Sequence, residues 1–527
     1  MDINSLLTLY VIISISIVSQ TFVHGSISLC DQAPYPDLCH DLILPNTSTT
    51  LTASLDQTQF SFRDVALRAT LERAENAHNL VSFMNVSSFD ERAMSAWSDC
   101  LELYEDTVDQ LNRCINSNTD SASAQTWLSA AIANQQTCVN GFDDFQLSSH
   151  FQSFFPPMVT DVSKLLSNSL FINKAVATQT ESGPLESTRS RRLLSSRGFP
   201  GWVSTYDRRL LQSSTSRADV VVAQDGSGNY KTITEAVAAA AKRSGTSRYV
   251  IHVKAGTYKE NIEIKKSMKN LMFIGDGKDV TIVTGSKNVQ DGSTTFKSAT
   301  FAVSGPGFIA RDMTFENTAG PQKHQAVALR SGSDLSIFYS CSFKGYQDTL
   351  YVYSQRQFYR NCDIYGTVDF IFGDATAVIQ NSNIYARKPM SGQKNTITAQ
   401  GRSDPNENTG IVIHNSIIAA AENLGSVKTY LGRPWKQYSR TVVMKSTLGG
   451  LIDPAGWLEW SGNFALNTLY YGEYLNSGTG ASTSGRVKWG GYHVITSSAE
   501  AGKFTVGNFL AGGSWISSTG VPFSSGL

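Results

Sequence analysis

The sequence predicts two modules of different fold class, an all-α bundle followed by an all-β parallel β-helix. Apolar residues recur at helical spacing between about residues 54 and 170. Short β-branched stretches separated by turn residues fill residues 218–527, and several polar residues there recur about 21 positions apart. A chain of 527 residues is also too long for one ordinary domain.

A run of thirteen apolar residues begins at Leu6. It is shorter than a membrane span and suits the core of a signal peptide, which we place at residues 1–25. A signal anchor is the alternative, because the charged residues before the run are limited to Asp2. A signal peptide normally begins with a positively charged segment, and no Lys or Arg is present there. Glycosylation sequons at Asn46 and Asn85 favour the secretory route. We therefore expect a secreted protein with no stable membrane span.

Residues 26–175 are predicted to form a small antiparallel bundle resembling a four-helix bundle. From Trp97 to Leu111, apolar residues recur at three- and four-residue steps with acidic residues between them. Core packing is the expected role of these side chains, and no catalytic constellation is visible there. Five of the seven cysteines precede residue 140. Seven cysteines in a secreted chain permit disulfides and leave at least one unpaired.

Residues 176–217 are rich in Ser, Arg, Gly and Pro, which indicates an exposed linker. The tetrad Arg-Arg-Leu-Leu occurs twice in this linker. Its basic pairs are Arg191 with Arg192 and Arg208 with Arg209. A repeated basic pair in an open linker favours cleavage by a processing protease, the alternative being a solvated charged segment.

The net charge of zero conceals an uneven distribution. Through residue 211 the chain carries 13 basic against 22 acidic residues, and the remainder carries 31 against 22. This balance indicates two modules that attract each other or a basic module that binds a polyanion. Two solvated surfaces of different composition are the alternative.

The module at residues 218–527 has one stretch of helical character, Thr234 to Lys242, and many short strands. Such strands suit a sandwich, a barrel or a β-solenoid. The spacing of polar residues favours the solenoid. The repeating pairs are Asp348 with Asp369 and Cys341 with Cys362, 21 apart, and Gln325 with Gln347, 22 apart. One coil of a parallel β-helix takes about 20 to 25 residues, so each pair is expected to lie on adjacent coils about 4.8 Å apart.

Two stacked aspartates give this module a candidate active site. Because neighbouring carboxylates cannot both ionise cheaply, Asp348 and Asp369 can serve as an acid and a nucleophile. Gln325 and Gln347 can donate amide N–H groups to a developing oxyanion. A hydrogen-bonded ladder in the turns is the structural alternative. Asp369 lies in an apolar strand, however, where an unpaired carboxylate is costly.

Arg433 is a candidate cation for Asp369, and the nearby Trp435 offers a flat face to a sugar ring. The chain has no Gly-x-Ser-x-Gly turn and no clustered histidines, so we expect neither a serine nucleophile nor a metal site.

Five motifs of this module resemble the plant pectin methylesterase family. They are Gly256–Glu260, Gln325–Leu329, Gly345–Leu350, Gly366–Gly373 and Leu431–Trp435. The residues before the linker resemble the pectin methylesterase inhibitor family. The cysteines that match its two disulfides are Cys30 with Cys39 and Cys100 with Cys138.

The resemblance implies a right-handed parallel β-helix that hydrolyses the methyl esters of pectin without a cofactor. It implies that Asp369 is the nucleophile, Asp348 the proton donor and Gln347 and Gln325 the oxyanion stabilisers. It places Thr295, Gln325, Arg433 and Trp435 at substrate-binding positions. It also implies a secreted cell-wall enzyme whose pro-region restrains the catalytic module until cleavage, and it gives no reason to expect nucleic acid as a partner.

One departure concerns Cys362, because Ser382 stands where the family commonly has its disulfide partner. Cys341, one coil away, is the other candidate partner, and two thiols are the alternative. The rival functions are another β-helix enzyme, such as a pectate lyase or polygalacturonase, and a non-enzymatic carbohydrate-binding or inhibitory protein.

Overall fold

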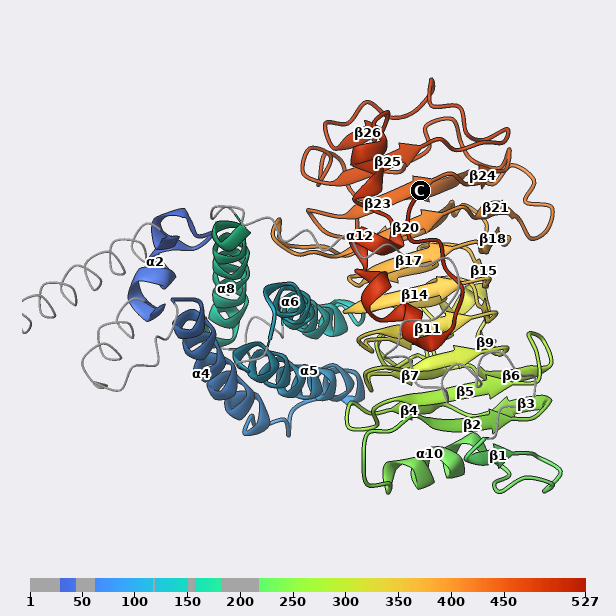
Figure 1. Cartoon of the computed structure of the whole chain (residues 1–527), viewed down its shortest axis with the longest axis horizontal. Helices are drawn as coiled ribbons and strands as arrows, with labels where there is room; N and C mark the ends of the chain where they lie inside the picture. The colour runs from blue at the N-terminus through green and yellow to red at the C-terminus, as the bar shows by residue number, and fades with distance from the viewer. Residues whose placement is uncertain (1–28, 44–61, 117–118, 150–154, 156, 182–217) are drawn as a thin grey trace, which may run out of the picture. The chain divides into compact units, whose positions relative to one another are not determined.

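The computed structural model describes residues 29–43, 62–116, 119–149, 155, 157–181 and 218–527 (Figure 1). The predicted signal peptide, Asn46 and both basic tetrads lie outside these residues. The chain forms two compact units. The first comprises Met1–Ser87, Cys100–Gln136 and Ser148–Thr188, and the second comprises Ser88–Asp99, Thr137–Leu147 and Arg189–Leu527. Among the described residues, no helix combines the length and apolarity needed to cross a bilayer.

Four long helices form most of the N-terminal region, as the apolar spacing predicted. They are α4 (Phe62–Ser82), α5 (Glu91–Ile115), α6 (Ser121–Asp143) and α8 (Pro157–Glu181). Within the first unit, buried polar contacts join helices α4 and α8. The Thr70 and Ser169 hydroxyls lie 2.8 Å apart, and Arg63 Nε donates to Asn173 Oδ1 at 2.7 Å. Such contacts fix how the two helices pack, because a buried polar group without a partner is costly.

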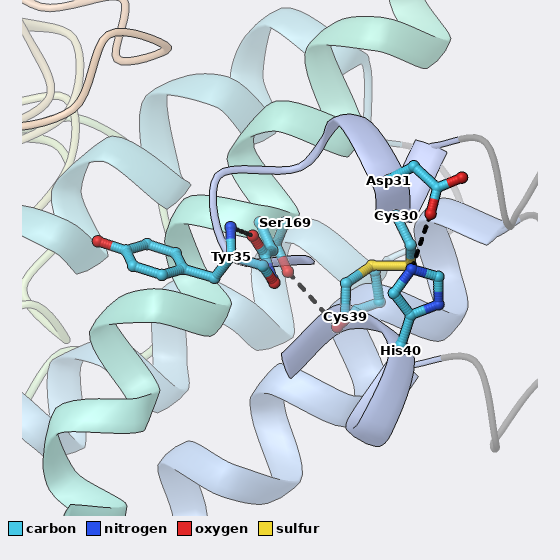
Figure 2. Close-up of a disulfide and its surroundings, with 8 residues drawn as sticks. Cys30, Asp31, Tyr35, Cys39, His40 and Ser169 are labelled. Carbon is cyan, nitrogen blue, oxygen red and sulfur yellow. Dashed lines mark hydrogen bonds and ion pairs between the residues drawn. A yellow bond between two sulfur atoms is a disulfide. The ribbon is translucent and has the colours of Figure 1, made fainter. Parts of the chain in front are cut away.

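Two short elements precede these helices, α2 (Pro36–Leu38) and η1 (Cys39–Ile43). The predicted disulfide between Cys30 and Cys39 is present, with the Cα atoms 5.4 Å apart. Figure 2 shows this bridge beside the contact between His40 Nε2 and Asp31 Oδ1, at 2.9 Å. Cys100 and Cys138, the other predicted pair, are both disulfide-bonded.

The module at residues 218–527 is a right-handed parallel β-helix of three sheets, as predicted (Figure 1). The eleven-stranded sheet contains, in spatial order, β1 (Val220–Val222), β2 (Tyr249–Val253), β5 (Leu271–Gly275), β8 (Ile309–Arg311), β11 (Ser336–Tyr339), β14 (Arg356–Arg360), β17 (Thr376–Gln380), β20 (Gly410–His414), β23 (Arg440–Met444), β25 (Tyr470–Tyr474) and β26 (Tyr492–Val494). The seven-stranded sheet contains β22 (Thr429–Gly432), β19 (Asn395–Gln400), β16 (Ile371–Gly373), β13 (Leu350–Val352), β10 (Leu329–Ser331), β7 (Phe301–Val303) and β4 (Ile262–Ile264). The eight-stranded sheet contains β24 (Thr447–Leu448), β21 (Ile417–Ala420), β18 (Asn383–Ala386), β15 (Asp363–Gly366), β12 (Ser342–Lys344), β9 (Thr314–Asn317), β6 (Thr281–Gly285) and β3 (Gly256–Lys259).

Each coil from β7 to β24 contributes one strand to each sheet, and neighbouring coils pair in parallel. Leu329 pairs with Leu350, which pairs with Ile371, so two successive steps in this sheet are 21 residues long. These three side chains point into the buried core between the sheets. The 21-residue spacing is therefore one coil of the solenoid.

Helix α10 (Ile233–Ala241) covers the first coil, where the sequence predicted a helix. Thr232 and Glu235 form a capping box at its start, and Ile233 and Ala236 join the core. The sequence did not predict the short C-terminal helices α11 (Ser498–Gly502) and α12 (Val506–Phe509), which are too brief to show a helical period.

A turn between β11 and β12 repeats on later coils and carries a ladder of small polar side chains. Cys341, Cys362, Ser382, Ser416 and Ser446 occupy successive rungs. The N–H groups of Cys362, Ser382 and Ser416 each donate at 3.1 Å to the serine hydroxyl on the next rung. The residue before each rung has positive φ, from 51° to 54°. Ser382 thus continues a hydrogen-bonded ladder in place of a disulfide.

Of the two alternatives for Cys341 and Cys362, a disulfide or two thiols, the structure has two buried thiols. Cys341 Sγ donates to Ala310 O at 3.5 Å, and Cys362 Sγ donates to Phe338 O at 3.4 Å. Each thiol therefore bonds to the backbone of a preceding coil. Cys114 is the third buried free cysteine.

Candidate active site

Asp348 and Asp369 lie at the same level of adjacent coils, directly before β13 and β16. Leu350 pairs with Ile371 two residues after them, and the Asp348 N–H donates to Val368 O at 3.1 Å. Both aspartates have positive φ, 62° and 50°, a conformation that aspartate adopts more readily than most residues. The predicted stacking of the two carboxylates on neighbouring coils is confirmed.

Glycines at both ends of the Asp369 segment permit the close approach of its neighbours. A Cβ atom on Gly366 would lie 2.2 Å from the Phe370 Cβ. Gly373 has φ of 127°, and a Cβ atom there would lie 2.1 Å from Val352 O on the preceding coil. The glycines of this motif are therefore required by the backbone.

The Asp369 carboxylate is held on both oxygens. Arg433 donates from Nε to Oδ1 at 2.8 Å and from its terminal NH2 nitrogen to Oδ2 at 2.6 Å. Thr396 Oγ1 also donates to Oδ1, at 2.6 Å, and accepts from the Asp369 N–H at 2.9 Å. The carboxylate is only 8% exposed, so these donors replace water. Arg433 is thus the cation that pairs with Asp369, as the sequence predicted. Its guanidinium also stacks over the Trp460 ring, 4.3 Å from the ring centroid.

Asp348 has a different environment. Burial raises the pKa of its carboxyl group well above the usual range, and the negative charges of Asp369 and Asp144 raise it further. Arg433 acts in the opposite direction but does not cancel these effects. Asp348 therefore keeps its proton to a higher pH than an ordinary aspartate does, beside an aspartate that is paired with a cation.

Gln325 and Gln347 also come from neighbouring coils, but their positions along the strands differ by one residue. The Ala326 N–H donates to Gln347 O at 3.3 Å, so Ala326, and not Gln325, lies level with Gln347. The offset arises because the glutamines are 22 residues apart in a region where the register is 21. Gln347 Oε1 is buried and has no hydrogen-bond partner among the described residues. This amide oxygen can therefore accept a hydrogen bond from a ligand.

Aromatic side chains border the carboxylates. Tyr351 and Phe372 stack with ring centroids 4.2 Å apart, and Trp435 meets them edge-on at 6.4 and 5.8 Å. Trp435 is the aromatic residue that the sequence predicted, and Tyr351 and Phe372 were missed. Strand alternation does not mark them, because each lies three residues after one of the paired aspartates and residues three apart in a strand point to opposite faces.

Thr294 and Thr295 are contacted by two segments of the N-terminal region, residues 88–99 and 137–147, which belong to the same compact unit as the β-helix. Asp144 Oδ2 accepts from the Thr295 N–H at 2.7 Å, and Oδ1 accepts from Thr295 Oγ1 at 3.1 Å. The neighbouring Thr294 hydroxyl donates to Asp99. Lys436 Nζ, next to Trp435, donates to Asn140 Oδ1 at 3.0 Å.

Burial raises the pKa of Asp144 to about 6, despite the hydrogen bonds from Thr295. Asp144 also raises the pKa of Asp348. A carboxylate from the N-terminal region is therefore an electrostatic neighbour of the paired aspartates. Nothing in the sequence singled out Asp144, because an isolated acidic residue after a helix is common.

Two further predictions concern modification and metals. Asn85 is exposed on the loop after α4, and its Oδ1 accepts from the Ser87 N–H at 3.1 Å. Within the described part of the chain, no three His, Cys, Asp or Glu residues are grouped as a metal site requires.

Both modules match family models. Residues 219–513 match the pectinesterase family, and residues 27–172 match the plant invertase/pectin methylesterase inhibitor family. The probable pectinesterase/pectinesterase inhibitor 6 of Arabidopsis thaliana is 56% identical, over 99% of this chain and 97% of its own. Pectinesterase 2 of Citrus sinensis is 53% identical, over 99% of this chain and 100% of its own.

Two solved structures agree with this result. The pectin methylesterase from carrot is 63% identical, with a TM-score of 0.59, over 60% of this chain and 100% of its own. The pectin methylesterase from Aspergillus niger in deglycosylated form is 33% identical, with a TM-score of 0.50, over 57% of this chain and 97% of its own. The resemblance inferred from the sequence motifs is confirmed for both modules.

Proposed function

Since this chain belongs to the pectinesterase family, we propose that its β-helix hydrolyses the methyl esters of pectin with Asp369 as nucleophile and Asp348 as acid and base. Pectin methylesterase activity follows from family membership, and the proposal concerns the residues. One observation carries it. A carboxylate fixed by Arg433 lies one coil from a buried carboxyl group whose pKa is raised. Such a pair supplies a nucleophile and an acid from the same residue type.

The first step forms a bond from an Asp369 oxygen to the carbonyl carbon of the methyl ester, and the carbonyl electron pair moves to oxygen. Gln325 and Gln347 donate amide N–H groups to this oxyanion. As the intermediate collapses, Asp348 gives its proton to the departing methoxide, and methanol leaves. An acyl-enzyme anhydride on Asp369 and an ionised Asp348 remain.

The second step uses water. Asp348 takes one proton from the water molecule as its oxygen bonds to the acyl carbon, and Asp369 leaves as a carboxylate. The product is a galacturonate carboxyl group, and Asp348 is again protonated. Arg433 holds Asp369 in position throughout, while Trp435 and Thr295 bind the sugar chain.

The test is methanol release from esterified pectin. Asp369→Asn is expected to abolish release, while Asp363→Asn, six residues earlier in the same coil and paired with Lys278 at 2.6 Å, is the matched control. A pectate lyase would instead form unsaturated products, and a polygalacturonase would form reducing ends. Unchanged methanol release by Asp369→Asn would leave only the binding or inhibitory alternative.

We also propose that the inhibitor-like region restrains the enzyme until a protease cuts near an Arg-Arg-Leu-Leu tetrad. The hydrogen bonds between Thr295 and Asp144 support this, because they occupy a residue proposed to bind the substrate chain. Asn140 of the same segment also accepts a hydrogen bond from Lys436, next to Trp435. The secretory sequons support a cell-wall location. Uncleaved precursor and cleaved enzyme are to be compared at equal concentration. Equal activity would contradict restraint, and N-terminal sequencing of the secreted protein would identify the cut.

A further inference from the structure

We propose that Asp374 and Glu407 are positioning residues that share one buried proton, and that this proton holds in place the loop against which Trp435 packs. The aspartate mechanism makes no use of these two carboxyl groups. The inference adds a dependence on pH to the proposed function, and its link to pectin rests on the role proposed for Trp435.

The register of the β-helix brings the two carboxyl groups together inside the module. Asp374 directly follows β16, and Glu407 lies in the loop of residues 401–409 between β19 and β20. Gly373 pairs with Gln400, so Asp374 and the start of this loop are level on neighbouring coils. Asp374 is 5% exposed and Glu407 is 1% exposed. Both groups are therefore removed from water, where an ionised carboxylate without a partner is costly.

The surrounding donors satisfy one oxygen of each carboxyl group. Asp374 Oδ1 accepts from Gln400 Nε2 at 3.0 Å and from Thr409 Oγ1 at 2.5 Å. Glu407 Oε1 accepts from the Ser403 N–H at 3.3 Å and from Ser403 Oγ at 3.1 Å. Asp374 Oδ2, in contrast, is buried and has no donor among the described residues. One oxygen of Asp374 is thus left without a hydrogen bond from a neighbouring donor.

A proton shared by the two side chains supplies this missing donor. The carboxyl groups of Asp374 and Glu407 form a hydrogen bond with each other. Ionised carboxylates can only accept, so this bond requires a proton on one of the two groups. Burial, followed by the negative charge of Asp374, raises the pKa of Glu407 well above its usual range, and burial raises that of Asp374. The proton belongs to the pair and not to either residue alone.

Positive charges near the pair do not take the place of the proton. In the described part of the chain, Arg402 donates to the carbonyl oxygens of Glu407, Pro405 and Tyr438, and not to a carboxylate. The other titratable groups that act on the pair or on its arginines are Arg440 and Lys436, which attract the carboxylates, Asp404, which repels them, and the phenols of Tyr438 and Tyr470. The pair therefore depends on its own proton for a hydrogen bond between the two carboxyl groups.

The loop that carries Glu407 supports the segment that carries Trp435. A Cβ atom on Gly401 would lie 3.0 Å from Trp435 Cε3, so the indole packs directly against the first residue of the loop. The Tyr438 N–H donates to Arg402 O at 3.0 Å, and this bond joins the two segments a second time. Loss of the shared proton leaves two neighbouring carboxylates that repel each other. Their separation displaces the loop and loosens the packing of Trp435.

The experiment uses residues 218–527, because the carrot structure matches 60% of this chain over 100% of its own length and so folds without an inhibitor-like region. Asp374→Asn and Glu407→Gln each put an amide N–H where the shared proton lies and remove its titration. Asp334→Asn is the matched control, because Asp334 is also buried, at 2% exposure, but is paired with Arg356 at 2.8 Å. Thermal unfolding and steady-state methanol release are measured between about pH 5 and pH 9.

The expected direction follows from the raised pKa of the pair. Its stabilising contribution is fully present below about pH 4, the unfolded value, and is lost as the pH rises through the raised pKa of the folded pair. The amide variants lack this loss. Their unfolding temperature should therefore rise relative to that of the wild type by about 3 °C or more between pH 5 and pH 9. Over the same range, the KM of the wild type should rise at least about threefold relative to theirs. Asp334→Asn should instead have a lower unfolding temperature than the wild type, because Arg356 loses its partner.

Each comparison is made at the same pH, because Asp348 titrates in every variant. A difference in unfolding temperature that stays constant with pH would overturn the inference, and so would a KM ratio that stays constant. If one amide variant fails to fold, the other decides, and failure of both would show that the pair does not work through a proton that an amide can replace. Failure of the aspartate mechanism is recognised separately by an active Asp369→Asn, since the unfolding temperature requires no catalysis.

Discussion

Thr396 offers the sharpest test of how Asp369 is activated. Its hydroxyl is the one donor to this carboxylate, besides Arg433, among the described residues, and it also accepts the Asp369 N–H. Thr396→Val removes the hydroxyl with little change in shape. Because Thr396 is 1% exposed, water cannot readily take its place. The substitution therefore isolates one hydrogen bond to the nucleophile.

The expected loss can be worked from this geometry. A hydrogen bond to a charged group contributes about 1.5–3 kcal/mol, and about 1.4 kcal/mol corresponds to a factor of ten in rate. If the bond holds the carboxylate in its attacking position, kcat should fall roughly tenfold to a hundredfold with KM nearly unchanged. The buried N–H of Asp369 also loses its acceptor, so the free energy of unfolding should fall by about 1–3 kcal/mol.

The assay compares steady-state methanol release and thermal unfolding for Thr396→Val, Thr396→Ser and Thr398→Val. Thr396→Ser keeps the hydroxyl and should retain most of the activity. Thr398 lies two residues along β19 and donates to Leu431 O at 2.9 Å, so its loss should lower stability more than kcat. A Thr396→Val enzyme with more than half of the wild-type kcat would refute the reasoning, as would a Thr396→Ser enzyme that is equally impaired.

Three further predictions concern other parts of the chain. In the uncleaved precursor, Asp144→Asn should remove the pH dependence of restraint. Burial in the precursor raises the pKa of Asp144 from 3.8 to about 6, although the hydrogen bonds from Thr295 favour the carboxylate. On balance, protonation of Asp144 therefore favours the docked segment. This contribution is present below about pH 4 and is lost as pH rises through 6, a change of up to ~3 kcal/mol. Precursor activity relative to cleaved enzyme should therefore rise between pH 4 and 6, and a flat wild-type ratio would contradict this. Because Cys341 and Cys362 are unpaired, residues 218–527 should show two titratable thiols after denaturation. A reductant should leave the unfolding temperature of this module unchanged. Detection of a Cys341–Cys362 disulfide by mass spectrometry would disprove this prediction. Trp435→Ala should raise KM for pectin roughly tenfold with a smaller effect on kcat, because the substitution removes ring contacts and no reacting group. A selective fall in kcat would instead indicate that Trp435 takes part in the chemical step.

The paired aspartates were predictable from sequence because two consecutive coils have the same length. Residues 21 apart stack when no insertion intervenes, so Asp348 and Asp369 could be matched by counting. The next step in the same sheet is longer, because Ile371 pairs with Thr398, 27 residues on. Thr396 therefore lies outside any simple period, and no residue type in its neighbourhood marks it as a partner of a carboxylate.

Arg433 was inferred from the cost of an unpaired carboxylate in an apolar strand. That cost predicts that Asp369 has a cationic partner, but it does not predict where in the sequence the partner lies. Its motif supplied the position.

The segment that carries Asp144 also affects the pKa of Asp348, the proposed general acid. In the precursor, burial and two carboxylates, Asp369 and Asp144, raise the pKa of Asp348. Departure of residues 137–147 removes the charge of Asp144 and admits water to the site, and both changes lower the pKa of Asp348. Asp369 stays in place, so Asp348 still has a like charge one coil away. Release of the N-terminal segment would thus do more than uncover Thr295. It would move the pKa of the general acid toward the pH at which a group can both give a proton to methanol and take one from water.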